Sequence, residues 1–437
     1  MIQAGDLNIT RNVTNGRILR TQLNRIFENK NYSAFGELTV HRNRYQNSRI
    51  YQDFRFTRDR LGRISQKLET LEGSPQATFN YVYDTSGRLT SVQKNGAAVL
   101  SQVFDSNSNR TQVTENGSTI NATYDSKDQI LTWGTLQFTH NLNGELITIT
   151  DSSYLPAGST SFTYNVFGHL KSVTLPNGSQ ITYALDAFNR RVGKRLNGTL
   201  QKQFLWQDEL RIAAEYDGSG NLVSEFIYAQ SVNVPDYMIR GGIKYKLVKD
   251  NLGSILAVVN SANGVVAQQL SYSTYGQVLT DSNPGFQPFG FAGGLYDSDT
   301  KLVRFGAREY NGTIGRWMTK DPILFNGGDT NLYGYVLQDL VNYFDPSGFI
   351  FENAIANRTT PNQQGVLGLG LISAGTLAIR AGVLSLNPLL AITGGLTAYE
   401  GVRNFQKALE RKAQIPGLEM LDEVNNKNSS GEQLCKN

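Results

Sequence analysis

The sequence predicts a mostly β protein built around a long antiparallel sheet. Three observations point to this class. Gly (43), Tyr (21) and Phe (21) are numerous among the 437 residues, a composition typical of strands joined by tight turns. A short motif recurs: an aromatic residue, Asp or Asn, two to four turn residues often ending in Gly, a polar residue, then Leu or Ile. Apolar and polar residues alternate around the motif, as in Phe162 to Leu175, which is the period of a half-buried strand.

The repeat can be followed along the first half of the chain. Clear copies begin at Tyr32, Tyr83, Phe104, Tyr124, His140 and Tyr164, and degenerate copies at Arg11, Arg58 and Leu185. Their mean spacing is roughly 22 residues, within the range that marks stacked repeat units. Because His140 occupies a position otherwise held by an aromatic residue, we expect it to serve packing.

Each unit makes physical sense as strand, turn and strand. Asp or Asn starts the turn, and Gly takes the left-handed backbone conformation that other residues avoid. One hairpin is marginal alone, so neighbouring units must continue the sheet and hide its edges. The periodicity predicts the long sheet but does not decide its closure, since a filled sandwich or an open solenoid would give the same pattern.

Composition changes toward the C-terminus. Residues 204–304 are less regular but keep strand-like runs, with Ser231 to Gly242 expected as a longer loop. Residues 304–349 are rich in Gly and aromatic residues and contain two Asp-Pro pairs, which indicate turns. We expect one continuous β unit over 1–349, divided into repeats (1–286) and a plug (287–349), followed by a distinct region at 350–437 with a short α-helical tail.

Several function classes are disfavoured. A net charge of +4 without a basic cluster gives no indication of a nucleic-acid partner. The single cysteine, Cys435, excludes an internal disulfide. The three histidines lie far apart, so neither a metal site nor a Ser/His/Asp triad is expected, and no motif predicts a cofactor. The first residues lack the features of a signal peptide.

Residues 249–349 carry a family resemblance. The matching pieces are ARxYxxxxGRW at Ala307 to Trp317, KDPI at Lys320 to Ile323, GGDTNLYGYV at Gly327 to Val336 and DPSGF at Asp345 to Phe349, with supporting matches at 249–279 and 288–294. In this order and spacing they resemble the core that ends Rhs or YD-repeat shells, as in bacterial polymorphic toxins and the C components of Tc toxins, and more distantly teneurins. The resemblance implies a hollow shell with a variable C-terminal region as its cargo.

The same resemblance implies a chemistry. Toxin-bearing members cut themselves by an aspartyl-type reaction after the DPxGL motif, which here places the cleaved bond at Phe349-Ile350. Arg308 and Asp321 fall on the family's Arg and Asp, and Glu309 on a position that is usually Asp. Two carboxylates in one site take different pKa values, so one can act as acid while the other activates water. The alternative is that Arg308, Glu309 and Asp321 form a buried ion-pair network.

Two functions therefore compete. One is a self-cleaving shell that encloses or presents an effector, with an immunity protein or secretion carrier as further partners. The other is a non-enzymatic YD-repeat binding protein, secreted or at the cell surface. An inactive remnant of a larger protein is a variant of either. Both imply export by a specialised route.

The region after Phe349 allows one further expectation. Residues 365–399 are almost wholly apolar, and 400–413 predict an amphipathic helix carrying Arg403, Lys407, Arg411 and Lys412. We expect residues 365–412 to act on a membrane. Packing of the apolar peptide inside the shell is the alternative.

Overall fold

The computed structural model describes residues 2–46, 48–153 and 158–353. The chain divides into two compact units, 1–369 and 370–437. The second unit lies outside the described residues, as do the predicted helical tail and the membrane-active segment 365–412. Within the described residues no helix is long and apolar enough to span a membrane.

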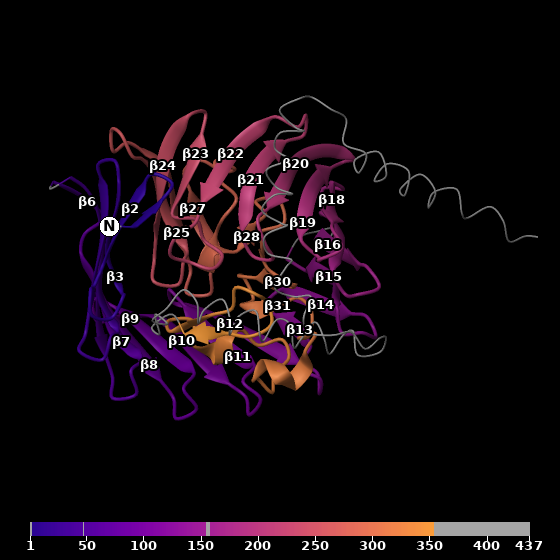
Figure 1. Ribbon diagram of the computed structural model, residues 1–437. Coiled ribbons are helices and arrows are strands. Elements are labelled where there is room, and N and C mark those ends of the chain that lie inside the picture. The colour runs from indigo at the N-terminus through magenta and orange to yellow at the C-terminus, as the bar shows by residue number, and fades with distance from the viewer. Residues whose placement is uncertain (1, 47, 154–157, 354–437) are drawn as a thin grey trace, which may run out of the picture. The chain divides into compact units, whose positions relative to one another are not determined.

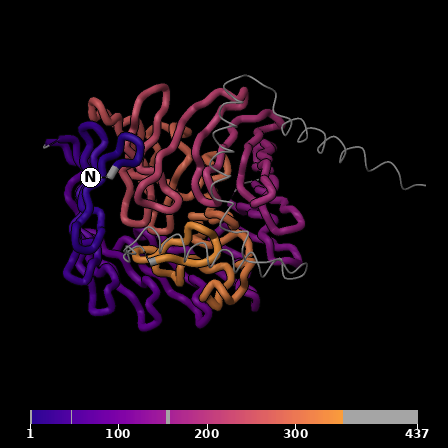
Figure 2. Tube along the Cα trace, viewed as in Figure 1, coloured from indigo at the N-terminus to yellow at the C-terminus, as the bar shows by residue number. Residues whose placement is uncertain are grey.

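The predicted fold class is confirmed, because the first unit is dominated by one 27-stranded antiparallel sheet (Figures 1 and 2). Each strand pairs with the next along the chain, so the sheet is a continuous meander. The strands are β1 Ile2–Ala4, β2 Leu7–Arg11, β3 Ile18–Leu23, β4 Ile26–Tyr32, β5 Leu38–Tyr45, β6 Arg49–Arg58, β7 Ile64–Leu71, β8 Ala77–Tyr83, β9 Leu89–Lys94, β10 Ala97–Phe104, β11 Arg110–Glu115, β12 Ser118–Tyr124, β13 Ile130–Trp133, β14 Leu136–His140, β15 Leu146–Asp151, β16 Gly158–Tyr164, β17 Leu170–Thr174, β18 Gln180–Leu185, β19 Arg191–Leu196, β20 Thr199–Trp206, β21 Ile212–Asp217, β22 Leu222–Ile227, β23 Tyr237–Arg240, β24 Ile243–Lys249, β25 Ile255–Asn260, β26 Val266–Tyr272 and β27 Val278–Asp281.

The turn between β8 and β9 shows why the motif has its form. The Asp84 carboxylate Oδ1 accepts hydrogen bonds from the backbone N–H groups of Ser86 and Arg88, at 2.9 and 3.0 Å. Gly87 takes a φ of 86°, the left-handed conformation that costs glycine least. Arg88 folds back to pair with Asp84 at 2.7 Å. Leu89, the next residue, is fully buried and begins the returning strand.

The tyrosine of the motif ties its repeat to the one before it. The Tyr164 hydroxyl donates to the Leu146 carbonyl oxygen at 2.8 Å, where Leu146 is the first strand residue after the preceding turn. Matching bonds run from Tyr32 to Ile18, Tyr83 to Ile64, Tyr124 to Arg110, Tyr228 to Ile212 and Tyr272 to Ile255. A backbone carbonyl is thereby satisfied in each repeat that carries this tyrosine. The copies with Phe104, His140 or Leu185 at the position have no hydroxyl to make the bond.

The first strands of the sheet pack against much later ones. Leu7 and Leu23 share a hydrophobic cluster with Tyr237 of β23. The Arg25 backbone N–H donates to the Ser261 carbonyl oxygen at 3.2 Å. Figure 1 shows β2 and β3 beside β24 and β25 accordingly. The sheet therefore curls until strands more than 200 residues apart meet.

The predicted plug (287–349) is compact and continues to residue 353, and from here the plug denotes residues 287–353. It follows the sheet (Figure 1) and shares a hydrophobic cluster with it. It contains η1 Phe291–Gly293, β28 Leu295–Tyr296, β29 Leu302–Phe305, β30 Arg308–Asn311, β31 Arg316–Trp317, η2 Leu324–Gly327, η3 Val336–Gln338, β32 Tyr343–Phe344 and β33 Glu352–Asn353. Strands β28 to β31 form a small antiparallel sheet.

The expected loop at 231–242 needs correction. Tyr237–Arg240 forms β23, which pairs with β22 and β24, so only the residues before Tyr237 form the connection. Pro235 and the polar residues around it hid a strand that has just four residues. Its first two members, Tyr237 and Met238, are almost fully buried.

Candidate active site

The plug places the two predicted neighbours Arg308 and Glu309 on opposite faces of β30. Consecutive residues of a strand point in opposite directions. In the pairing of β29 with β30, Arg308 lies opposite Phe305 and Glu309 opposite Arg304. The two side chains therefore enter different surroundings.

Arg308 joins three parts of the plug. Its Nε donates to the Gly348 carbonyl oxygen at 2.5 Å. Its Nη2 lies 3.0 Å from Asp321 Oδ2 and 3.4 Å from Asp345 Oδ2. The guanidinium carbon sits 4.1 Å from the centre of the Trp317 ring. One buried cation thus holds two carboxylates beside the segment that contains the predicted cleavage site.

Both carboxylates are easier to protonate than an ordinary aspartate. Burial raises the pKa of Asp321 to about 6, although the Arg308 charge opposes the shift. Burial also raises the pKa of Asp345, again against the influence of Arg308. We call Asp321 and Asp345 the carboxylate pair. Two carboxylates that share one cation and have raised pKa values are suited to acid–base catalysis, in which one is protonated while the other is ionised.

The carbonyl oxygen of the predicted cleavage site lies near Gly327, as does Asp321 Oδ2. Both oxygens face Gly327, which has no side chain to separate them. A Cβ atom at that position would lie 2.7 Å from Asp321 Oδ2 and 3.0 Å from the Phe349 carbonyl oxygen. Asp345 Oδ1 accepts the backbone N–H groups of Gly348 and Phe349 at 2.9 and 3.3 Å. Asp345 therefore fixes the local backbone with one oxygen and faces Arg308 with the other.

A small cavity opens among these groups. Its volume is ≈ 20 Å³, and its walls include Arg308, Asp321, Asp345, Gly327 and Phe349. That is room for about one water molecule. The site thus brings together two carboxylates, a cation, a peptide carbonyl and space for a nucleophile.

Glu309 is not brought together with Arg308 and Asp321. Its Oε1 accepts hydrogen bonds from Arg191 at 2.9 Å and from Arg304 at 2.6 Å. Arg304 continues to the Asn189 carbonyl oxygen at 2.5 Å. Glu309 therefore anchors the plug to a repeat turn through a separate ion-pair network, whereas the structural alternative expected one network shared with Arg308 and Asp321.

Other plug side chains also bind repeat turns. Arg316 donates to Asn109 Oδ1 at 2.8 Å and to the Asp128 carbonyl oxygen at 2.6 Å. Tyr333 donates to the Gly144 carbonyl oxygen at 2.8 Å, and its ring lies 6.2 Å from that of His140, which confirms the packing role expected for this histidine. The plug is held by contacts with many turns along one edge.

Two anchoring residues were missed from the sequence although a signal was present. Arg110 and Arg191 occupy the buried position that other repeats fill with Leu or Ile, and both are almost fully buried. Arg191 pairs with Glu309, while Arg110 donates to the Ile314 carbonyl oxygen and lies 3.6 Å from the centre of the Tyr275 ring. An arginine at an apolar repeat position marks a contact with the plug.

The fold and this arrangement define a YD-repeat shell protein. A family model described as Teneurin YD-shell matches residues 1–339. The chain therefore belongs to the teneurin YD-shell family.

Individual relatives agree with this assignment. The chain is 31% identical to Teneurin-3 of Danio rerio over 286 residues and 32% identical to Teneurin-1 of Gallus gallus over 258, covering 61% and 58% of this chain. It spans only 10% and 8% of those relatives' lengths. In the crystal structure of TcdB2-TccC3, the similar part covers 78% of this chain and 20% of that one, with a TM-score of 0.55 and 16% identity. The TcdB2-TccC3-Cdc42 structure is similar over 78% of this chain and 19% of that one, with a TM-score of 0.54 and 17% identity. These structures share the fold.

Proposed function

We propose that this protein is a YD-repeat shell that presents residues 350–437 and releases them by cutting its own Phe349-Ile350 bond. The observation that carries the proposal is the position of the Phe349 carbonyl oxygen beside Asp321. Arg308 at the same place contacts Asp321, Asp345 and the Gly348 carbonyl oxygen. Because the substrate belongs to the same chain, no binding step is needed and proximity supplies much of the rate.

The carboxylate pair can perform the hydrolysis. One ionised carboxylate takes a proton from the cavity water, whose oxygen attacks the Phe349 carbonyl carbon. The other carboxyl, protonated, hydrogen-bonds the carbonyl oxygen and then supplies the proton that the leaving Ile350 nitrogen requires. One water is consumed, leaving a new carboxylate at Phe349 and a new amine at Ile350. The Arg308 cation stabilises the charge that develops on oxygen.

This mechanism assigns the second carboxylate to Asp345 and not to Glu309. Asp345 shares Arg308 with Asp321, whereas Glu309 contacts Arg191 and Arg304. In the proposal Glu309 has an anchoring role: it keeps β30 in place against the sheet.

The fate of the released region stays a proposal as well. We infer that residues 365–412 act on a membrane after release, and that the protein works outside the cell or at its surface. An immunity protein or secretion carrier would belong to the same system. Leakage of dye from anionic liposomes on addition of the processed protein, with none from an uncleaved variant, tests the membrane proposal.

A second candidate is a binding protein that never cuts itself. It is favoured by the 31% and 32% identity to teneurins over 286 and 258 residues. In that case residues 350–437 remain attached, so the same experiment separates the two functions.

The experiment is an intact-mass measurement on folded full-length protein at pH 6 to 7. We expect a fragment that begins at Ile350 and disappears in Asp321→Asn and Asp345→Asn. Glu309→Gln is the matched variant. Cleavage should persist in the folded fraction of Glu309→Gln, which is identified by an unchanged circular dichroism spectrum. Intact wild-type protein would rule out self-cleavage and leave the binding function. Loss of cleavage in folded Glu309→Gln would return the second carboxylate to Glu309.

A further inference from the structure

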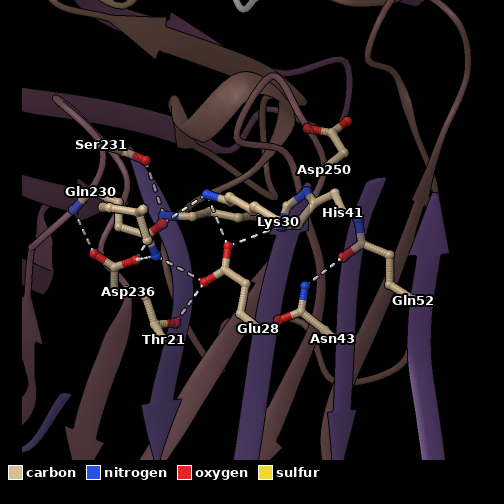
Figure 3. A network of polar contacts seen from close by, with 12 residues as sticks. Thr21, Glu28, Lys30, His41, Asn43, Gln52, Gln230, Ser231, Asp236 and Asp250 are labelled. Atoms are coloured by element: carbon tan, nitrogen blue, oxygen red, sulfur yellow. Dashed lines mark hydrogen bonds and ion pairs between the residues drawn. The ribbon is translucent and has the colours of Figure 1, made fainter. Parts of the chain in front are cut away.

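A second group of buried charges lies away from the carboxylate pair, where the first strands meet the later ones (Figure 3). Glu28 of β4 and His41 of β5 are almost fully buried, and their side chains are 2.9 Å apart. Lys246 of β24 approaches Glu28 to 3.0 Å, and Asp236 lies just before β23. Nothing in the proposed self-cleavage uses this group.

Three members of the group form a closed triangle. The Lys30 Nζ lies 2.7 Å from Gln230 Oε1 and 3.1 Å from Glu28 Oε1. The Gln230 Nε2 donates to Glu28 Oε2 at 2.8 Å. The same nitrogen also donates to Asp236 Oδ1 at 2.6 Å. An amine therefore touches a carboxamide, and one carboxylate contacts both the amine and the nitrogen that would leave.

We propose that Lys30 and Gln230 join in an intramolecular isopeptide bond, with Glu28 carrying the protons. Glu28 takes a proton from the Lys30 ammonium, and the free amine attacks the Gln230 carboxamide carbon. The new Nζ–Cδ bond forms as the old Nε2–Cδ bond breaks. Glu28 delivers its proton to the departing nitrogen, which also removes the surplus proton from Nζ and leaves as one ammonium ion. No oxidant, metal or other reactant is needed.

The surroundings explain why this reaction is slow and how its reactants are held in place. Burial disfavours the charged form of Lys30, but Glu28, Tyr32 and Asp236 together outweigh this effect, so the pKa of Lys30 is raised. The reactive amine is therefore the minor form, and the reaction is slow. A single turnover is enough, because the product is a permanent part of the fold. Two carboxylates accept hydrogen bonds from Gln230 Nε2 and hold the carboxamide in one orientation. The entropy cost of bringing the two reacting groups together is therefore already met by folding.

A neighbouring pair offers a competing reaction with a different product. Lys249 Nζ lies 3.3 Å from Asp236 Oδ1, and their condensation would release water. Asp236 already accepts the Ala229 and Gln230 backbone N–H groups at 2.7 and 3.0 Å. Burial lowers the pKa of Lys249 more than Asp236 raises it, whereas the pKa of Lys30 is raised, so the neutral amine is less disfavoured at Lys249. The leaving molecule, ammonia or water, distinguishes the two reactions by mass.

The bond would connect residues 200 positions apart. It would join β4 to the segment that follows β22, where the curled sheet meets itself. Such a link would hold the meeting strands together even when their hydrogen bonds open, because a closed loop restricts the unfolded chain.

The test is the mass of the purified full-length protein under denaturing conditions. We expect the mass to be lower than that of the sequence by one ammonia, and proteolysis to give a branched peptide that joins Lys30 to Gln230. Lys30→Arg keeps the charge but should restore the full mass and lower the thermal midpoint. Lys202→Arg is the control, since Lys202 also pairs with a glutamate, Glu215 at 2.7 Å, but should leave the deficit unchanged.

The outcomes separate cleanly. A mass without the deficit, in protein aged for days, overturns the proposal. Loss of one water, mapped to Lys249 and Asp236, overturns the assignment to Lys30 and Gln230. Any fragment beginning at Ile350 changes the masses by a known amount, so self-cleavage does not obscure the result.

Discussion

The repeat sheet and the plug are stabilised in different ways. In the sheet, many units use the same local devices, such as the Asp84 turn and the Tyr164 hydroxyl bond to the preceding repeat. In the plug, single buried charges contact distant partners: Arg308 holds two carboxylates, and Glu309 pairs with Arg191, 118 residues away. The turn contacts of the sheet recur in many repeats, whereas each plug contact occurs once.

This difference explains where chemistry can reside. A repeat residue with many equivalents stabilises its own turn, and a change there stays local. A buried charge in the plug has an altered pKa and a defined partner, and such groups are the ones from which active sites are made. The repeats build the framework, and the plug adds the buried charges of the candidate active site.

The largest expected effect is loss of the Arg308 cation. Arg308→Met leaves Asp321 and Asp345 buried without their shared partner, which should cost about 3–5 kcal/mol of unfolding free energy and abolish cleavage. Arg88→Met in a repeat is the matched control: Arg88 also pairs with an aspartate, Asp84, and stacks on an aromatic ring. A partly exposed pair of this kind contributes about 0–1 kcal/mol. Urea unfolding of both variants compares them, and equal losses would contradict the distinction between sheet and plug.

The second prediction concerns acid. Burial lowers the pKa of His140 and of His169 to about 4, below the unfolded value of about 6.5. Protonation therefore favours the unfolded chain. The contribution of these two histidines lowers the unfolding free energy as pH falls from about 6.5 toward 4. Burial raises the pKa of Asp321 and of Asp339 to about 6. The contribution of these two plug residues therefore raises the unfolding free energy as pH falls from about 6 toward 4.

Two double variants separate these contributions. His140→Gln with His169→Gln should make the protein lose less stability between pH 7 and pH 5 than the wild type. Asp321→Asn with Asp339→Asn should make it lose more. Urea midpoints measured across this range check both signs, and parallel pH curves for all three proteins would contradict the assignment.

The sequence predicted the sheet well because its information is local and repeated. Each motif copy found from Asn12 to Asp186 starts a hairpin turn, as the bonds closing those turns confirm. The strand β23 was missed because its four residues carry no motif. Glu309 was grouped with Arg308 and Asp321 from the family resemblance, although strand geometry alone separates the side chains of Arg308 and Glu309. The position of Asp345 beside Arg308 depends on a contact between residues 37 positions apart in the sequence, which no local pattern encodes.

The third prediction tests whether the repeats act independently. Removing the hydroxyl in Tyr164→Phe leaves the Leu146 carbonyl without that donor, and Tyr272→Phe does the same for Ile255. Each should lower the unfolding free energy by about 1 kcal/mol. Since the two bonds belong to separate repeats, the double variant should lose the sum within about 0.5 kcal/mol. Strong non-additivity in urea unfolding would show that distant repeats communicate.

The smallest expected effect comes from one turn position that three repeats fill without glycine, at Ser108, Asp128 and Asn189. Asn189 and Asp128 have φ values of 61° and 62°, where most other turns carry Gly. The buried Asn189 Oδ1 has no hydrogen-bond partner, while the Asn189 backbone oxygen still receives Arg304. Asn189→Gly should therefore be neutral or stabilise the protein by up to about 1 kcal/mol, because it relieves the backbone and removes an unsatisfied group.

Asp128→Gly makes the same backbone change with the opposite expected sign. The Asp128 carboxylate accepts hydrogen bonds from Asn107 and from Asn109, the latter at 2.7 Å, and Asn109 in turn binds Arg316 of the plug. Loss of these bonds should cost about 1–2 kcal/mol, more than relief of the left-handed conformation returns. Thermal unfolding of the two variants side by side measures the contrast. If both shift the midpoint equally, the turn conformation alone sets the effect, and contact with the plug adds nothing to a repeat turn.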